Sequence, residues 1–209
     1  MPLLSKYLTH ARLSRISPYL GEEILDVGCG YGELLEYLHP TTKRIVLLDR
    51  SSERQSEVER RLARTKVTAE FVVEDIGDSE IKLNLPPFDT VVMAALLEHL
   101  TSPAIALQNI RNIMKSGAKL VLTTPTPLGG KLHWLGSHLG LVYVEAAEEH
   151  VGFHGYSALK SLFQAAGFRI DYYEKFLFGL NQLMIATLTA SLHVSSDESK
   201  TRGQTPGTH

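Results

Sequence analysis

The chain has 209 residues, of which 44% are hydrophobic, and a formal net charge of -2. This length and apolar content fit one domain of ordinary size with a buried core. The slight negative charge disfavours a nucleic-acid partner, which would call for a basic face. The single cysteine, Cys29, excludes a disulfide within the chain and is typical of a reducing, cytoplasmic setting.

No stretch of the sequence predicts a membrane anchor. Residues 1–10 lack the apolar core of a secretion signal. The most apolar stretch, 176–192, contains Asn181, Gln182 and several threonines, which favours a buried strand over a membrane span.

The first predicted elements are one or two short helices within residues 3–20. Leu13, Ile16 and Leu20 recur at helical spacing there, and Gly21 ends the pattern.

A predicted strand, tight turn and helix follow at 23–38. The strand ends in a group of glycines, Gly28, Gly30 and Gly32. Glycines let the backbone turn sharply and lie against a ligand, and the start of the helix offers unpaired N–H groups to that ligand. A dinucleotide-binding turn would carry its third glycine at the position of Glu33, where a carboxylate would repel a pyrophosphate. With Asp26 expected at the mouth of the site, the turn favours a ligand that has a positive end and no phosphate. A purely structural turn stays the alternative.

The next predicted strand ends in Asp49, an acid placed to accept hydrogen bonds from the hydroxyls of a ribose. Ser51 and Ser52 are expected to cap a charged helix over 53–64. A third strand is predicted over 67–73.

The remaining elements alternate between strands and helices. A fourth strand over 88–95 precedes a helix over 102–114, whose end is placed at 114–118 with Gly117 as its cap. A fifth strand is predicted over 119–124.

The final predicted elements are a helix and a pair of strands. Ser157 is expected to cap the helix and Gly167 to end it. The last strands are predicted over 169–174 and 176–189.

Several of these patterns closely resemble the motifs of the class I S-adenosylmethionine (SAM)-dependent methyltransferases, particularly the ubiquinone- and menaquinone-type small-molecule branch. The motifs are Asp26-x-Gly28-x-Gly30-x-Gly32, Asp49, Phe88-Asp89-x-Val91-Val92 and Leu97-x-His99-Leu100. The resemblance covers most of residues 23–127 and resumes at 150–168. It implies an α/β fold, a Rossmann-like doubly wound sheet of seven mostly parallel strands with a C-terminal antiparallel strand. It also implies SAM as the cofactor and S-adenosylhomocysteine (SAH) as its product.

The resemblance assigns cofactor contacts to particular residues. Asp75 would accept a hydrogen bond from the adenine amino group, Ile76 would pack on the ring, and Ala94 would present its carbonyl to the methionine ammonium. Tyr7 and Arg12 would reach the SAM carboxylate from the first helix, or else belong to a solvated basic face. Together, the residues expected to bind the cofactor are Asp26, Gly28, Cys29, Gly30, Asp49, Arg50, Asp75, Ile76, Ala94, Ala95 and His99.

Histidines are the expected catalytic bases, if the acceptor loses a proton as it attacks. His150 and His154 precede the helix that borders the acceptor pocket in the resembled fold, and His99 would lie near the reactive end of the cofactor. A packing or capping role is the alternative for each. A zinc site at His150 and His154 is rejected because Gly152 and Gly155 disfavour the helix that such a pair needs, so no metal is expected.

A single methyltransferase domain is expected over residues 1–193, with 1–20 as a helical cap. The apolar segment 128–149 is expected to be a lid over the acceptor pocket or an interface, which would suit a homodimer. The tail, 194–209, is rich in small and polar residues and is expected to be disordered.

The sequence therefore predicts SAM-dependent methyl transfer to a small-molecule acceptor, without defining the acceptor or its reacting atom. One alternative is a SAM-binding protein without catalysis. Another is an NAD-dependent oxidoreductase, which is disfavoured by Glu33 and by the lack of a second, catalytic domain.

Overall fold

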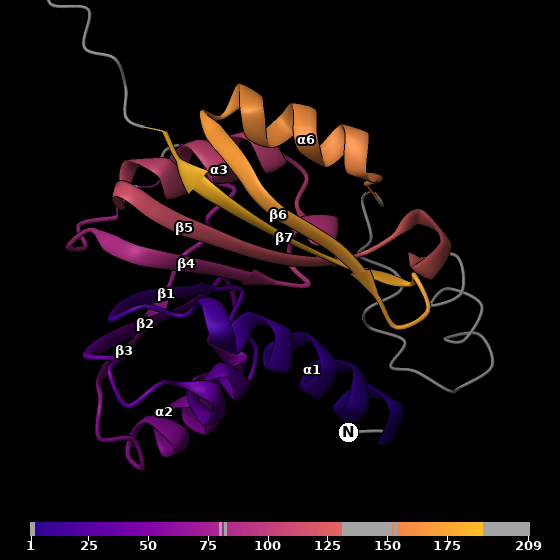
Figure 1. The fold of residues 1–209 in the computed structure, drawn as a ribbon. Helices are drawn as coiled ribbons and strands as arrows, with labels where there is room; N and C mark the ends of the chain where they lie inside the picture. The colour runs from indigo at the N-terminus through magenta and orange to yellow at the C-terminus, as the bar shows by residue number, and fades with distance from the viewer. Residues whose placement is uncertain (1–2, 80, 82, 131–151, 153, 190–209) are drawn as a thin grey trace, which may run out of the picture.

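The computed structural model describes residues 3–79, 81, 83–130, 152 and 154–189, which form a twisted sheet with helices on both faces (Figure 1). The sheet has seven strands in the order β3-β2-β1-β4-β5-β7-β6. Strands β1 to β5 pair in parallel, whereas β7 is antiparallel to both of its neighbours, as expected. The strands are β1 (Glu23–Val27), β2 (Arg44–Asp49), β3 (Thr68–Val73), β4 (Phe88–Ala94), β5 (Met114–Pro125), β6 (Phe168–Phe176) and β7 (Asn181–Leu188).

The strand order reverses direction between β1 and β4. In open α/β sheets, ligands bind outside the carboxyl ends of the strands at such a reversal. The fold therefore places a binding site where the glycine turn after β1 meets the end of β4.

Two helical layers cover the sheet. Helices α1 (Leu3–Ile16) and α2 (Gln55–Leu62) lie on one face, and α3 (Pro103–Asn112) and α6 (Tyr156–Ala165) lie on the other (Figure 1). α1, the longest of these, has 14 residues, and no described helix is long and apolar enough to cross a membrane.

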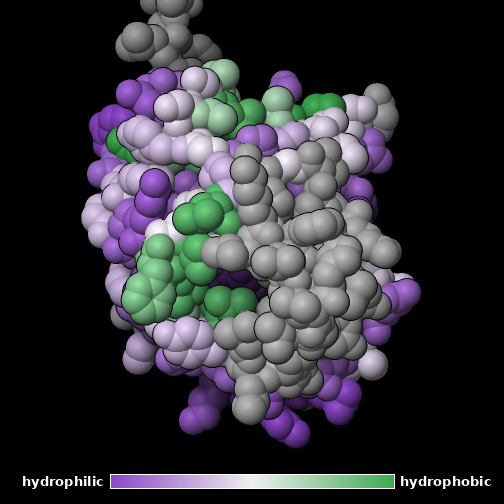
Figure 2. Space-filling model, turned by 90° about the vertical axis from the view of Figure 1, so that its right-hand side faces the viewer, coloured by the Kyte–Doolittle hydropathy of each residue, from purple (hydrophilic) through white to green (hydrophobic). Residues whose placement is uncertain are grey.

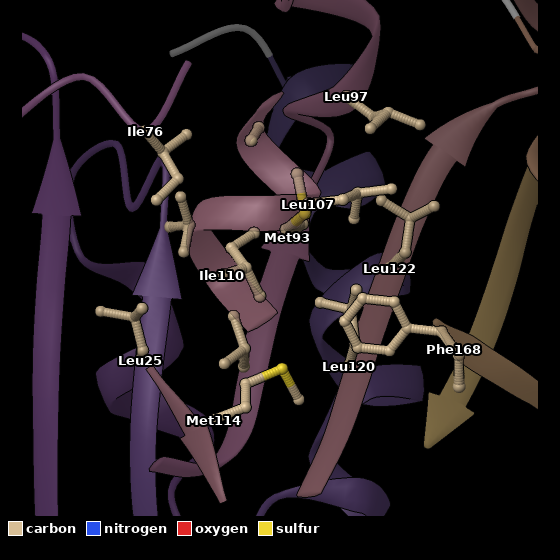
Figure 3. Close-up of a cluster of buried hydrophobic side chains, with 14 of the residues drawn as sticks. Leu25, Ile76, Met93, Leu97, Leu107, Ile110, Met114, Leu120, Leu122 and Phe168 are labelled. Carbon is tan, nitrogen blue, oxygen red and sulfur yellow. The ribbon is translucent and has the colours of Figure 1, made fainter. Parts of the chain in front are cut away.

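The central strands are apolar on both sides because both sides are buried. On the α3 and α6 side, Leu107 and Ile110 of α3 pack with Met93 of β4 and with Leu120 and Leu122 of β5 (Figure 3). This packing holds the carboxyl ends of the strands in fixed positions.

The expected helix end at 114–118 is wrong. Helix α3 stops at Asn112, and Met114 already pairs with Phe88 as the first residue of β5. The register then shifts before Thr90 pairs with Lys119, so the intervening residues of β5 form an irregular bulge. Gly117, with a φ of 76°, supplies the left-handed conformation that this bulge contains.

Three smaller expectations also differ from the structure. The helix after the glycine turn is a short 3₁₀ helix, η2 (Glu33–Tyr37), because Pro40 leaves little room for regular helical turns. Gly155 rather than Ser157 precedes the first residue of α6, so Ser157 lies within its first turn. The last strand begins at Asn181, since Leu177, Phe178 and Gly179 all have positive φ and turn the chain.

Replacing a buried phenylalanine should measure how far the fold depends on the α6 packing. Phe163 on α6 is fully buried, so Phe163→Ala should lower the free energy of unfolding by about 3–5 kcal/mol in urea denaturation. Phe178→Ala is the matched control, because this ring is fully exposed, and it should change the value by less than about 0.5 kcal/mol. Equal losses would contradict the described packing.

Candidate cofactor-binding site

The glycine turn is hydrogen-bonded to the neighbouring strand, β2. The N–H groups of Gly28 and Cys29 both donate to the carbonyl oxygen of Leu48, at 2.7 and 3.2 Å. Gly28 has a φ of 69°, and a Cβ on it would lie only 2.7 Å from the side chain of Leu96. A larger residue at Gly28 would therefore strain the backbone and crowd the end of β4.

Asp49 completes this connection from the end of β2. Its carboxylate accepts hydrogen bonds from the backbone N–H groups of Gly30, at 3.1 Å, and Ser51, at 3.0 Å. The acid expected to hold a ribose is thus also the group that orients the turn.

A cleft of about 1170 Å³ opens at this carboxyl edge. Figure 2 views the same edge and shows hydrophobic side chains along one side of a recess. The cleft brings together eight of the predicted site residues: Gly28, Gly30, Asp49, Arg50, Asp75, Ile76, Ala95 and His99. These residues come from the ends of separate strands, so only the folded chain assembles them.

The cleft is also lined by residues that were not predicted from the sequence. Ser5 and Lys6 reach it from α1, and Tyr31 reaches it from the glycine turn. Tyr31 is 40% exposed, and the guanidinium of Arg54 lies over its ring at 5.0 Å. An aromatic inside a glycine turn is the one cue that a closer reading could have used.

Asp26 does not lie at the mouth of the site, so that expectation is wrong. It is only 3% exposed and lies beneath the turn, because its side chain points to the α1 face of the sheet. Cys29 is also buried, as expected for a small packing residue, and Ala94 is partly buried. None of the three is among the described residues that line the cleft.

Burial and the acids around the turn raise the pKa values of two groups beneath it, Asp26 and Cys29. Burial, followed by repulsion from Glu33 and Asp49, raises the pKa of Asp26 to about 8. Burial also raises the pKa of the Cys29 thiol, and the same carboxylates add to the effect. Both groups therefore hold their protons more tightly than usual, and a cationic ligand near the turn would favour the charged form of Asp26.

The three predicted catalytic histidines fall in different places. His99 ends a 3₁₀ helix, η4 (Leu97–His99), and lines the cleft. His154 precedes α6, and its carbonyl oxygen accepts a hydrogen bond of 2.7 Å from Gln182. His150 lies outside the described residues, as do most of the 128–149 segment and all of the 194–209 tail.

The sequence singled out only Arg12 from a group of polar residues on the far side of β4. Glu98 is 1% exposed, and its carboxylate accepts a hydrogen bond of 2.9 Å from the hydroxyl of Thr124 on β5. On β7, Asn181 accepts a hydrogen bond of 3.2 Å from Nε of Arg12. We call Arg12, Glu98, Thr124 and Asn181 the β5–β7 polar cluster. Glu98 could have been noticed as an acid within an apolar run.

Comparison with known families identifies the chain. A family model described as a methyltransferase domain matches residues 5–173. The chain belongs to this family.

Individual relatives of this methyltransferase are more distant. It is 29% identical over 121 residues to a ubiquinone biosynthesis O-methyltransferase of Xanthomonas euvesicatoria, an alignment that covers 56% of this chain and 50% of the relative. The chain thus spans about half the length of the curated relatives it matches.

Solved structures agree with the methyltransferase fold. A SAM-dependent methyltransferase of Methanosarcina mazei has a TM-score of 0.61 at 23% identity, covering 84% of this chain and 97% of that chain. The magnesium protoporphyrin IX methyltransferase of Synechocystis PCC 6803, solved with bound SAH, has a TM-score of 0.66 at 17% identity, covering 90% and 88%. The expected class I fold and SAM as the cofactor are thereby confirmed.

The raised pKa of Asp26 predicts a pH-dependent stability. An unfolded aspartate loses its proton near its ordinary pKa of 3.8, whereas folded Asp26 keeps it until about 8. Between these values the folded state holds more protons, so the free energy of unfolding should fall as pH rises, by at most about 1.4 kcal/mol per pH unit.

Urea denaturation of the ligand-free protein at pH 5 and pH 8 measures this effect, with Asp26→Asn as the matched variant. The variant cannot lose a proton at this position, so its loss of stability between the two pH values should be smaller. Identical losses in both proteins would show that Asp26 titrates normally.

Proposed function

We propose that this methyltransferase transfers the methyl group of SAM to a small-molecule acceptor. The single observation that carries the proposal is the cleft in which the glycine turn, Asp49 and the Asp75–Ile76 pair meet at the strand reversal. A cleft that places these groups along one edge suits a nucleoside joined to an amino acid.

The proposed cofactor pose follows the order of the strands. The adenine would lie near β3, where Ile76 is buried and Asp75 is exposed after the strand. The ribose would hydrogen-bond to Asp49 at the end of β2. The methionine part would lie between the glycine turn and the end of β4, near Ala94, Ala95 and His99. Cys29 would support this pose from below the turn, and Arg50 would lie beside the ribose.

The reaction in this proposal is an in-line displacement at the methyl carbon. A lone pair on the acceptor forms the new bond as the carbon–sulfur bond breaks, and the electron pair returns to sulfur to give neutral SAH. The protein contributes mainly by holding acceptor and methyl close and aligned. If the attacking atom carries a proton, His99 is the base candidate that lines the cleft, with His150 and His154 as the others.

The curated relatives support the choice of acceptor. Their name, ubiquinone biosynthesis O-methyltransferase, makes a hydroxyl oxygen of a small molecule the acceptor to test first. The net charge of -2 supports an acceptor other than nucleic acid, and the single buried Cys29 supports a cytoplasmic location. A homodimer stays a prediction.

A SAM-binding protein without catalysis is the second candidate, because no histidine is yet tied to proton transfer. The two candidates differ in one measurement, the formation of SAH from SAM over a panel of phenols, catechols, amines and thiols. Turnover with any hydroxyl acceptor supports the proposal. SAM binding without SAH formation across the panel would favour the second candidate. The family match disfavours an NAD-dependent oxidoreductase.

Removing the Asp49 carboxylate should weaken cofactor binding. Asp49→Ala deletes a charged hydrogen-bond acceptor, so calorimetry should show SAM affinity reduced by about 1–3 kcal/mol. Asp89→Ala is the matched control, since this acid also accepts from two backbone N–H groups, those of Glu22 and Glu23, but at the opposite edge of the sheet. SAM affinity should be unchanged in the control. Equal effects in both variants would place the ribose elsewhere.

A further inference from the structure

A leucine that follows β4, Leu96, lies directly against the glycine turn. A Cβ on Gly28 would lie 2.7, 3.1 and 3.2 Å from the Cδ1, Cδ2 and Cγ atoms of Leu96, so the branched end of this side chain covers one face of Gly28. Both residues line the cofactor cleft. Leu96 therefore fills the space that the missing side chain of Gly28 leaves open.

The surrounding contacts hold Leu96 in this position. The preceding residue, Ala95, has a φ of 55°, a conformation that residues other than glycine seldom adopt, and its N–H donates to the carbonyl oxygen of Thr123 at 2.8 Å. The carbonyl oxygen of Leu96 accepts from the N–H of His99 at 2.9 Å. Its side chain is partly buried and packs against the hydrophobic core on the α3 and α6 side. Moving Leu96 away would break these contacts, so the leucine is a fixed part of the cleft wall.

The strand order indicates which part of the cofactor Leu96 meets. Along the carboxyl edge the strands run β3, β2, β1 and β4, and the proposed pose places the adenine, the ribose and the methionine part in the same order. The sulfur joins the ribose to the methionine chain, so in this pose it lies between Asp49 at the end of β2 and the end of β4. Gly28 follows β1 in that interval, and Leu96 covers it. The pose therefore brings the sulfur next to Leu96.

A second leucine of the same segment marks the other end of the proposed pose. Leu100 also lines the cleft, and its Cδ2 atom lies 3.9 Å from where a Cβ on Gly77 would be. Gly77 follows the Asp75–Ile76 pair, which is proposed to hold the adenine. Leu96 and Leu100 thus carry the same side chain but contact the sulfur end and the adenine end.

We propose that Leu96 is a specificity-determining residue that limits the group on the cofactor's sulfur to the size of a methyl. This inference rests on the proposed function, and it deepens that function by naming what selects the transferred group. One methylene more or less in an apolar pocket changes affinity by about 10- to 200-fold. Charge makes no such selection, because S-methyl and S-ethyl sulfonium groups carry the same charge.

The test compares three ligands that differ only in what the sulfur carries. SAH has no substituent, SAM has a methyl group, and S-adenosyl-L-ethionine has an ethyl group. Each is titrated calorimetrically into the full chain. The wild type should bind SAM about tenfold or more tightly than the ethyl analogue, because the extra methylene meets the fixed leucine. Equal binding of SAM and the ethyl analogue would overturn the proposal without any variant.

Variants then assign the selection to Leu96. Leu96→Ala should reduce the advantage of SAM over the ethyl analogue to about threefold or less, because the deleted methyl groups leave room for the extra methylene. Leu96→Val removes a single methylene and should give an intermediate advantage, and it replaces the alanine variant if that variant does not fold.

The matched control removes the same atoms at the adenine end. Leu100→Ala, or Leu100→Val if the alanine variant does not fold, should keep the full advantage of SAM over the ethyl analogue even where the affinity for all three ligands falls. The same change of ratio in the variants of both leucines would show that the selection does not come from Leu96.

Failure of the proposed function gives a different result. If the wild type binds none of the three ligands, the proposed function itself is contradicted. If SAM binds but the Leu96 variants keep the wild-type advantage over the ethyl analogue, only the inference about Leu96 is wrong.

Discussion

The site depends on how the glycine turn is joined to β2. The carbonyl oxygen of Leu48 accepts from both Gly28 and Cys29, and the carboxylate of Asp49 accepts from Gly30. These bonds fix the turn across two adjacent parallel strands, so the turn and the Asp49 carboxylate cannot move independently. The pose proposed for the cofactor depends on these hydrogen bonds, because they hold the glycine turn against the end of β2.

The same hydrogen bonds bring three carboxyl groups close together in a largely buried place. Asp26 lies beneath the turn with Glu33 and Asp49 near enough to raise its pKa. Such an arrangement costs stability in the empty protein, and a ligand with an ammonium and a sulfonium would offset that cost. A dinucleotide would add negative charge to the same region. The electrostatics of the turn therefore favour SAM over a dinucleotide. The reason is the one inferred from Glu33 in the sequence, that a carboxylate repels a pyrophosphate.

Patterns that depend on neighbouring residues were predictable from the sequence. The continuous apolar strands and the glycine turn, with the family resemblance that they carry, led to the correct sheet and cofactor class. Features that depend on distant contacts were not. The bulge at Gly117 exists because Met114 pairs with Phe88, and the burial of Asp26 follows from which face of β1 it occupies. The contact between Arg12 and Asn181 joins residues 169 positions apart, and no local pattern could have indicated it.

The most direct test of the account is a parallel calorimetric titration of the purified chain with SAM, SAH and NAD. The glycine turn, the buried acids and the strand reversal together predict micromolar binding of SAM and SAH and no binding of NAD. Binding of NAD alone would contradict the account at its centre, because the carboxylates around the turn would then have to accommodate a pyrophosphate.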